Sequence, residues 1–313
     1  MILVCGGALI DMVPEGDVYR PCPGGGVCNT AVAIGRLGVP VKFLAKLSTD
    51  FFGDILVKRL TDNNIGLDYV VRNAKHSTLA FVKLEKGKEP QYVFFTDNSA
   101  DRSLADTDVP ASLPPDLNCI VFGDIAMTME PVASTIEKFI FREHKNGKAV
   151  ISFDPNIRPL MIADKASYIN RFEKWIAASD ITKISEADYE YIYPNLSLDE
   201  CIEKTLSLGP HLAVVTLGDK GVTAVLRRDN GTVRKTIPNK KIEVVDTIGA
   251  GDTFHGAFLS YLEIHGKMSP AALAAMSGED LDKALMFANA AAALVCTRKG
   301  AEPPTLKETE NAL

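Results

Sequence analysis

The chain alternates short, apolar, β-branched runs with longer amphipathic stretches along most of its 313 residues. The apolar runs predict buried β-strands at 2–7, 41–48, 119–125, 149–156, 180–185 and 212–218. The amphipathic stretches predict helices at 27–37, 50–64, 130–146, 165–179 and 197–208. Strands that are apolar throughout, each followed by a helix, indicate a mainly parallel sheet covered on both faces. We therefore expect a single three-layer α/β/α domain over residues 1–313.

A different pattern over residues 78–97 interrupts this alternation. Two strand-like runs flank a KGKEP turn with no helix between them, which predicts a hairpin. Together with the N-terminal segment, this hairpin is expected to form a small β-sheet lid from about 12–25 and 75–98. Its aromatic residues Tyr92, Phe94 and Phe95 have two interpretations. They pack on a neighbour as strand formers, or they line a lid that closes over a ligand and excludes water.

The composition narrows the classes of partner. Hydrophobic residues make up 46% of the chain and charged residues 24%, as expected for a soluble globular protein with a substantial core. The net charge of −6 argues against a nucleic-acid partner, because binding to a phosphate backbone needs a basic surface. A small phosphorylated ligand is compatible with this charge, since it needs only a local positive site.

The cysteines and the apolar segments indicate a cytoplasmic protein. No two cysteines form a C-x-x-C pair or have the neighbours of a zinc site, so we expect reduced thiols at Cys5, Cys22, Cys28, Cys119, Cys201 and Cys296. The first residues, MILVCGGALIDMV, lack the basic lead and long apolar run of a signal peptide. No apolar stretch approaches the roughly 18 residues of a membrane span.

The segment DTIGAGDTFHGAF, residues 246–258, carries most of the functional information. A helix with one buried face is predicted from the helical spacing of Phe254, Ala257, Phe258, Tyr261 and Leu262. Gly249, Ala250 and Gly251 then lie at its amino end, where the backbone N–H groups are free and the helix dipole is positive. An anion can approach those groups closely because large side chains are missing. Asp252 follows in the first turn.

Two interpretations of this turn are compatible with its residues. Asp252 merely complements the helix dipole while the glycines make a tight turn, or the carboxylate acts beside an anion hole. The second arrangement suits phosphoryl transfer to an alcohol, because the helix end stabilises the moving charge and the carboxylate orients or accepts the hydroxyl proton. A Rossmann fingerprint is excluded because Phe254 stands where its third glycine belongs, and no P-loop pattern occurs.

A second glycine run, PGGGVCNTAVAIGRLG, covers residues 23–38 and also enters a helix. Asn29 is polar in a first turn that is otherwise apolar. Its side chain either caps the helix or bridges two hydroxyls of a sugar.

The two glycine segments together resemble the two signatures of the ribokinase-like (PfkB) carbohydrate kinases. Order, spacing and chain length agree, so the resemblance covers essentially the whole chain. Within the family, FFTDNSADRSL (94–104) and FDPNIRP (153–159) are most similar to fructokinases, although 2-keto-3-deoxygluconate kinases share the latter. The resemblance implies a ribokinase-like fold, and it implies ATP and Mg²⁺ as cofactors.

The resemblance also implies roles for individual residues. Asp252 would be the general base, and the amides of Gly249, Ala250 and Gly251 would form the anion hole, with Arg158 meeting phosphate. Sugar contacts would come from Asp11, Gly25, Gly26, Asn29 and Phe94. The nucleotide would lie against Lys183, Ser185, Thr216, Gly218, Gly221 and Asn289.

The resemblance also implies metal ions and a mode of assembly. Where many members carry N-x-x-E, this chain reads Ser185 to Asp188, so either Glu186 or Asp188 would serve magnesium, the latter through a bound water. A monovalent cation, K⁺, would lie near Asp246, Ile248 and Gly300. A homodimer would form through the lid.

The substrate implied by the resemblance is D-fructose, phosphorylated at its 6-hydroxyl. A 2-keto-3-deoxygluconate kinase needs an extra cation for the substrate carboxylate; Thr96 and Asp97 supply none, whereas Arg102 leaves that alternative open. A ribokinase, a nucleoside kinase and a sugar-binding regulator without catalysis are further alternatives. The intact GAGD turn argues against the regulator.

Overall fold

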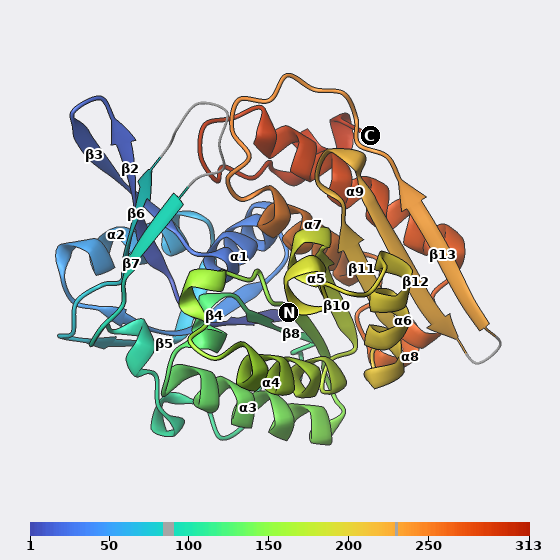
Figure 1. Ribbon diagram of the computed structural model, residues 1–313, viewed down its shortest axis with the longest axis horizontal. Helices are drawn as coiled ribbons and strands as arrows, with labels where there is room; N and C mark the ends of the chain where they lie inside the picture. The colour runs from blue at the N-terminus through green and yellow to red at the C-terminus, as the bar shows by residue number, and fades with distance from the viewer. Residues whose placement is uncertain (84–90, 229–230) are drawn as a thin grey trace.

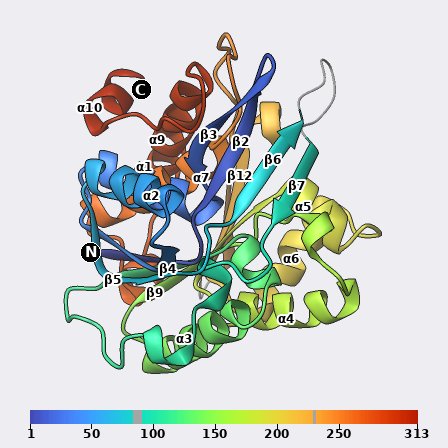
Figure 2. The same cartoon turned by 90° about the vertical axis from the view of Figure 1, so that its left-hand side faces the viewer.

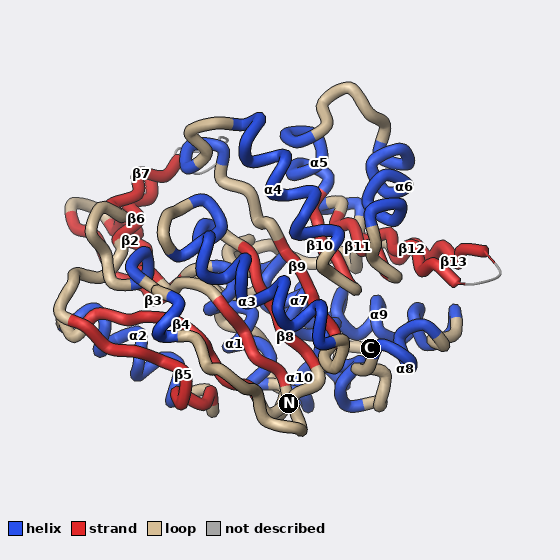
Figure 3. The backbone as a smooth tube through the Cα atoms, turned by 90° about the horizontal axis from the view of Figure 1, so that it is seen from below, coloured by secondary structure: helices blue, strands red, loops and turns tan. Residues whose placement is uncertain are grey.

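A computed structural model describes residues 1–83, 91–228 and 231–313. The main sheet has nine strands in the order β13-β12-β11-β10-β9-β8-β1-β4-β5 (Figure 3). Their bounds are β1 Ile2–Cys5, β4 Val41–Ser48, β5 Ile65–Asn73, β8 Cys119–Gly123, β9 Val150–Asp154, β10 Ile181–Ser185, β11 Leu212–Thr216, β12 Val222–Arg228 and β13 Gly231–Ile237. Only β12 and β13 run antiparallel to their neighbours among these strands. The predicted, mainly parallel sheet is confirmed.

Helices cover both faces of this sheet (Figure 1). Their bounds are α1 Gly26–Arg36, α2 Phe51–Asp62, α3 Val132–Asn146, α4 Lys165–Ala177, α5 Glu186–Ile192, α6 Leu198–Leu208, α7 Ala250–Ile264, α8 Pro270–Ala274, α9 Gly278–Cys296 and α10 Leu306–Asn311. Side chains of a strand alternate between two cores. Ile2 and Val4 of β1 pack with α1, α2, α7 and α9, whereas Leu3 and Cys5 pack with α3, α4 and α6. Within the described residues, no helix is both long and apolar enough to cross a bilayer.

Local capping signals fix where several of these helices begin. Asp50 accepts a hydrogen bond from the Gly53 amide at 2.7 Å and so caps α2. Asp164 caps α4 in the same way, through the amides of its first turn. Ser197 and Glu200 form a reciprocal capping box at the start of α6. These short polar residues therefore set the ends of helices whose apolar faces cover the sheet.

A second, four-stranded sheet stands beside the main one (Figure 2). It consists of β2 Leu9–Glu15, β3 Val18–Gly24, β6 Leu79–Lys83 and β7 Gln91–Phe95, in the order β3-β2-β6-β7. The pair β6–β7 is the hairpin predicted for 78–97, and its KGKEP turn lies outside the described residues. Asp11, Ala80 and Phe94 are aligned across β2, β6 and β7, so their side chains share one face of this sheet. Its movement as a lid stays a prediction.

The packing of α7 on α1 brings two distant segments together. A Cβ atom at Gly256 would lie 2.7 Å from Cβ of Ala33 and 2.8 Å from the carbonyl oxygen of Thr30. Only glycine allows the two helices to approach this closely. The amino ends of α1 and α7 therefore meet beside the carboxyl ends of the central parallel strands, the edge at which α/β proteins bind ligands.

Candidate active site

The carboxylate of Asp252 lies buried where α1 and α7 meet. Asn29, in the first turn of α1, donates a hydrogen bond from Nδ2 to Asp252 Oδ2 at 2.8 Å. Burial raises the pKa of Asp252 from 3.8 to about 7, although the bond from Asn29 opposes this shift. One oxygen of the carboxylate is therefore held in place, and the group exchanges a proton near neutral pH.

The amino end of α7 presents open backbone amides at Gly251 and Asp252, whereas the sequence assigned the anion hole to Gly249, Ala250 and Gly251. Gly249 precedes the helix with a φ of 75°, in the left-handed region that favours glycine. The Ala250 amide donates to the carbonyl oxygen of Thr247 at 3.2 Å. The amides of Gly251 and Asp252 reach no acceptor within the described parts of the chain. An incoming anion would therefore meet the amides of Gly251 and Asp252 first.

The Lys183 ammonium adds positive charge at this helix end. It extends from β10 so that a Cβ atom at Gly251 would lie 3.1 Å from its Nζ. Asp154, at the end of β9, accepts a hydrogen bond from Nζ at 2.9 Å, and both side chains are 6% exposed. Burial disfavours the charged form, but the neighbouring Asp154 carboxylate raises the pKa of Lys183. The lysine therefore stays charged and is fixed close to the α7 amides.

Two further groups assigned to ligand binding, Asp11 and Arg158, face the same region. Asp11 lies against Gly24, where a Cβ atom would come within 2.3 Å of its Oδ2. Burial, followed by the nearby charge of Asp124, raises the pKa of Asp11 to about 7. Arg158 donates from Nη1 to the Asn156 Oδ1 at 2.8 Å, which orients the guanidinium. The charge of Asp252 raises the pKa of both groups, so they belong to one cluster.

The absence of a side chain at Gly26 matters more to this cluster than its backbone amide does. Its amide already donates to Asp124 Oδ2 at 2.6 Å. A Cβ atom at this position would lie 2.4 Å from Asn156 Nδ2. Gly25 precedes α1 with a φ of 101°, again a conformation suited to glycine. The two glycines therefore let the start of α1 approach the ends of β8 and β9.

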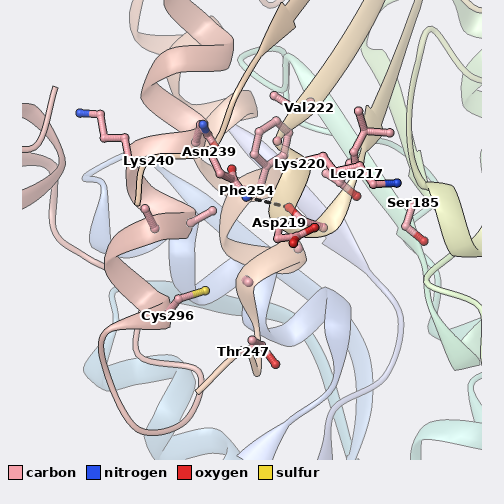
Figure 4. A pocket seen from close by; sticks show the side chains of 18 of the residues that line it. Ser185, Leu217, Asp219, Lys220, Val222, Asn239, Lys240, Thr247, Phe254 and Cys296 are labelled. Carbon is pink, nitrogen blue, oxygen red and sulfur yellow. Dashed lines mark hydrogen bonds between the residues drawn. The ribbon is translucent and has the colours of Figure 1, made fainter. Parts of the chain in front are cut away.

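A cavity of about 750 Å³ opens beside the amino end of α7 (Figure 4). Five of the six residues assigned to a nucleotide line it: Ser185, Thr216, Gly218, Gly221 and Asn289. The sixth, Lys183, does not line the cavity, but its Nζ lies close to Gly251, which does. Ala250 and Gly251 also line the cavity, so it reaches the open amides. Asn289 donates to the carbonyl oxygen of Pro238 at 3.0 Å, which fixes part of the wall.

The two carboxylates considered for magnesium have different surroundings. Asp188 accepts hydrogen bonds from the amide and hydroxyl of Ser185 and from the Ile157 amide, so it forms a capping box and ties α5 to the loop after β9. Glu186 instead lines the cavity and pairs with Lys220 at 3.0 Å. Of these two carboxylates, only Glu186 lines the cavity.

The three positions assigned to a monovalent cation are brought together by Asp246. Its Oδ1 accepts from the Ile248 amide at 3.0 Å, and its Oδ2 accepts from the Gly300 amide at 2.9 Å. The side chain therefore links the loop before α7 to the loop after α9.

Comparison with known proteins identifies the family. The model of the pfkB family carbohydrate kinase matches residues 11–308. The chain belongs to this family. It is 35% identical to a fructokinase of Rhizobium leguminosarum bv. trifolii over 286 residues, which cover 90% of this chain and 85% of that protein. The resemblance stated from the sequence is confirmed.

Solved structures of pfkB kinases confirm the predicted ribokinase-like fold. A fructokinase from Xylella fastidiosa with bound ATP superposes with a TM-score of 0.90 at 28% identity, covering 99% of this chain and 97% of that one. A fructokinase from Vibrio cholerae O395, in a form with fructose, ADP and calcium ion, gives a TM-score of 0.87 at 27% identity, with coverage of 100% and 98%. The three layers and the small sheet belong to this fold.

Four polar residues of this pfkB kinase site were not assigned a role from the sequence. They are Asp124, Asp154, Asn156 and His255, and the structure places them around the Asp252 carboxylate. The first three follow or end the buried strands β8 and β9. A polar residue at the carboxyl end of an apolar parallel strand was the available signal. His255 gave none, since its position on the helix has the spacing of a core residue.

Proposed function

We propose that this carbohydrate kinase is a fructokinase that transfers the γ-phosphoryl group of ATP to the 6-hydroxyl of D-fructose. Similar proteins support the choice of ATP and fructose as substrates, because one fructokinase structure holds ATP and another holds fructose with ADP. Both structures align with nearly the whole of this chain. The proposal therefore concerns the whole chain.

The observation that carries the proposal is the position of the Asp252 carboxylate. Asn29 holds one of its oxygens, and the open amides of Gly251 and Asp252 lie in the same helix turn. Asp252 orients the sugar hydroxyl and takes its proton while the oxygen bonds to the γ-phosphorus and the bond to ADP breaks. The amides and Lys183 stabilise the charge on the moving phosphoryl group. Because that transition state is loose, the base chiefly positions the nucleophile.

The residues around the sugar position suit a neutral substrate. Asp11 and Asn29 offer the carboxylate and amide that pair with hydroxyl groups. Phe94 shares the face of the small sheet that carries Asp11. Arg102, the cation that kept a ketodeoxygluconate substrate open, is engaged elsewhere: it pairs with Asp97 at 2.7 Å and donates to the Glu130 carbonyl oxygen. Because Arg102 is already paired, fructose is favoured over 2-keto-3-deoxygluconate as the substrate.

The nucleotide is assigned to the 750 Å³ cavity, with its terminal phosphate toward Gly251. Glu186 supplies a carboxylate on the wall, the oxygen ligand that Mg²⁺ prefers. Mg²⁺ accompanying ATP would neutralise phosphate charge there, with Glu186 or, through water, Asp188 as the protein contact. The loop joined by Asp246 is the proposed place for K⁺.

A coupled ADP-release assay tests this proposal across fructose, 2-keto-3-deoxygluconate, ribose and adenosine. Turnover with fructose is expected to give the highest kcat/KM, because Arg102, the cation considered for a substrate carboxylate, is already paired with Asp97. Turnover only with 2-keto-3-deoxygluconate would overturn the choice of sugar. Silence with all four, together with sugar binding by calorimetry, would indicate a regulator without catalysis.

We also propose a homodimer formed through the small sheet. Its outer face exposes Tyr19, Val93 and Phe95, at 48%, 59% and 55% exposure, around the ring of Phe81. The double substitution Val93→Glu and Phe95→Glu is expected to convert a dimer into a monomer, measured by light scattering after size exclusion. Leu160→Glu, at an exposed residue outside this sheet, should leave the dimer intact. A wild-type monomer would refute the proposal.

A further inference from the structure

His255 is a buried polar residue that the reaction scheme leaves without a role. It lies on α7 three residues after Asp252 and is 1% exposed. Its Nε2 lies 2.8 Å from the Ser152 hydroxyl, on β9. Its Nδ1 has no hydrogen-bond partner within the described residues, and the nearest carboxylate oxygen, Oδ2 of Asp154, is 3.7 Å away. Such an unpaired buried nitrogen is costly unless an unseen partner satisfies it.

His255 also lines a small cavity. Its volume is about 10 Å³, close to the minimum for one water molecule. It is lined by Gly26, Val27, Thr30, Asp124, Asp154, Asn156, Asp252 and His255. Six of these eight residues have polar side chains, and a buried water needs two to four hydrogen-bond partners. Among the described residues, no group of three or more His, Cys, Asp or Glu side chains has the arrangement to hold a metal ion.

The protonation of His255 determines how it meets this cavity. Burial, followed by the charge of Lys183, lowers the pKa of His255 to about 3, so the ring is neutral at physiological pH. A neutral imidazole carries one proton, on either Nδ1 or Nε2. We place the proton on Nδ1, because the Asp154 Oδ2 acceptor lies on that side of the ring, 3.7 Å away. Ser152 then donates its hydroxyl hydrogen to Nε2, which fixes the tautomer.

We propose that the cavity holds one water molecule that accepts a hydrogen bond from His255 Nδ1 and donates to Asp154 and Asp252. The water joins the carboxylate that fixes Lys183 to the carboxylate that orients the sugar hydroxyl. His255 is thus a positioning residue that acts on both sides of the reacting phosphoryl group. The kinetic part of this inference rests on the proposed kinase function, whereas the water and the tautomer do not.

The water and the tautomer can be tested on the unmodified protein without substrates. A crystal structure at high resolution should show one ordered water within hydrogen-bond distance of Nδ1. The ¹⁵N spectrum of histidine-labelled protein should show a protonated Nδ1 for His255, identified among the five histidines by its loss in His255→Asn. An empty cavity in well-defined density, or a proton on Nε2, would overturn the proposal whether or not the protein phosphorylates fructose.

The kinetic role can be tested with two variants of similar size. Asparagine places its amide near the position of Nδ1, and glutamine places its amide near that of Nε2. His255→Gln is therefore expected to lower kcat about tenfold, the effect of one hydrogen bond lost in the transition state, while the KM for fructose stays unchanged. His255→Asn should retain most of kcat.

Matched measurements separate positioning from folding. Both variants should melt at similar temperatures, because each leaves one ring contact unmade. His265→Gln, at an exposed histidine after the same helix, should have wild-type kinetics. Equal losses of kcat in the Asn and Gln variants would show that Nδ1 has no special role, and the positioning proposal would then be wrong.

Discussion

Replacing Asp252 by asparagine is expected to lower kcat by a factor of about 10²–10⁴, the usual contribution of a positioned general base. Asparagine has nearly the same shape and keeps an oxygen for the Nδ2 donor of Asn29. It cannot take the hydroxyl proton. The dissociation constants of sugar and nucleotide should therefore change little, so the loss falls on the chemical step. Single-turnover kinetics with calorimetric binding would measure both quantities.

The same substitution should stabilise the fold at alkaline pH. In the unfolded chain the Asp252 carboxyl loses its proton near pH 3.8, whereas in the native state it does so near pH 7. Between these values the native state holds more protons, so the free energy of unfolding falls as the pH rises from about 4 to about 7. Asparagine lacks this penalty. The variant should gain up to ~4 kcal/mol at pH 8 and nothing at pH 4.

Asp17→Asn provides the control for both measurements, because Asp17 is an exposed residue in the turn between β2 and β3. It should match the wild type in kcat and in stability at both pH values. A kcat within a few-fold of wild type for Asp252→Asn would remove the carboxylate from the mechanism. Equal stability of this variant and wild type at pH 8 would show that the native carboxylate is not destabilised by burial.

The fold could be predicted where strands are buried on both faces. The runs predicted at 41–48 and 119–125 are observed as β4 and β8, and both strands place apolar residues in the two cores that the helices cover. The edge strands β5 and β13 were not among the predicted strands. Each has a single neighbour in the sheet, and β13 alternates exposed with half-buried residues. Because such strands are not buried along their whole length, their sequences lack the continuous apolar run by which the other strands were predicted.

Features of the site that depend on neighbouring residues could also be predicted from the sequence. The position of Asp252 in the first turn of a helix followed from the spacing of apolar residues after it, and the structure confirms that start. The Ser185–Asp188 spacing is also a local signal, that of a capping box. It would have indicated that Asp188 is engaged with its own helix end, whereas the position of Glu186 on the cavity wall depends on the fold.

Contacts between distant segments could not be predicted in this way. The bond between Asn29 and Asp252 joins residues 223 positions apart, and it depends on how closely α1 and α7 approach at Gly256. Asp124 and Asn156 are single polar residues with positive φ values of 60° and 40°. No periodicity marks them. Their conformations are imposed by the packing of the loops after β8 and β9.

Replacing Gly251 by alanine would separate the chemistry at the helix end from its stability. The added Cβ would lie 3.1 Å from Lys183 Nζ, and Asp154 holds that ammonium in a buried pair. Gly251 also carries one of the open amides, so we expect the methyl group to hinder the approach of the phosphoryl group. We expect kcat to fall by about 10²–10³, as for loss of one oxyanion-hole donor. Thermal stability should change little, because alanine favours a helix over glycine by roughly 0.5–1 kcal/mol and offsets the tight contact.

Gly278→Ala is a close structural match for this variant. Gly278 is the first residue of α9, and a Cβ atom there would lie 3.3 Å from Cε of Lys235, which pairs with Asp282. Both substitutions therefore press a methyl group against an ion-paired lysine at a helix start, but only Gly251 faces the proposed phosphoryl path. Gly278→Ala should keep wild-type kcat. If both variants lost activity equally, crowding of a helix end would explain the loss, and the α7 amides would have no catalytic part.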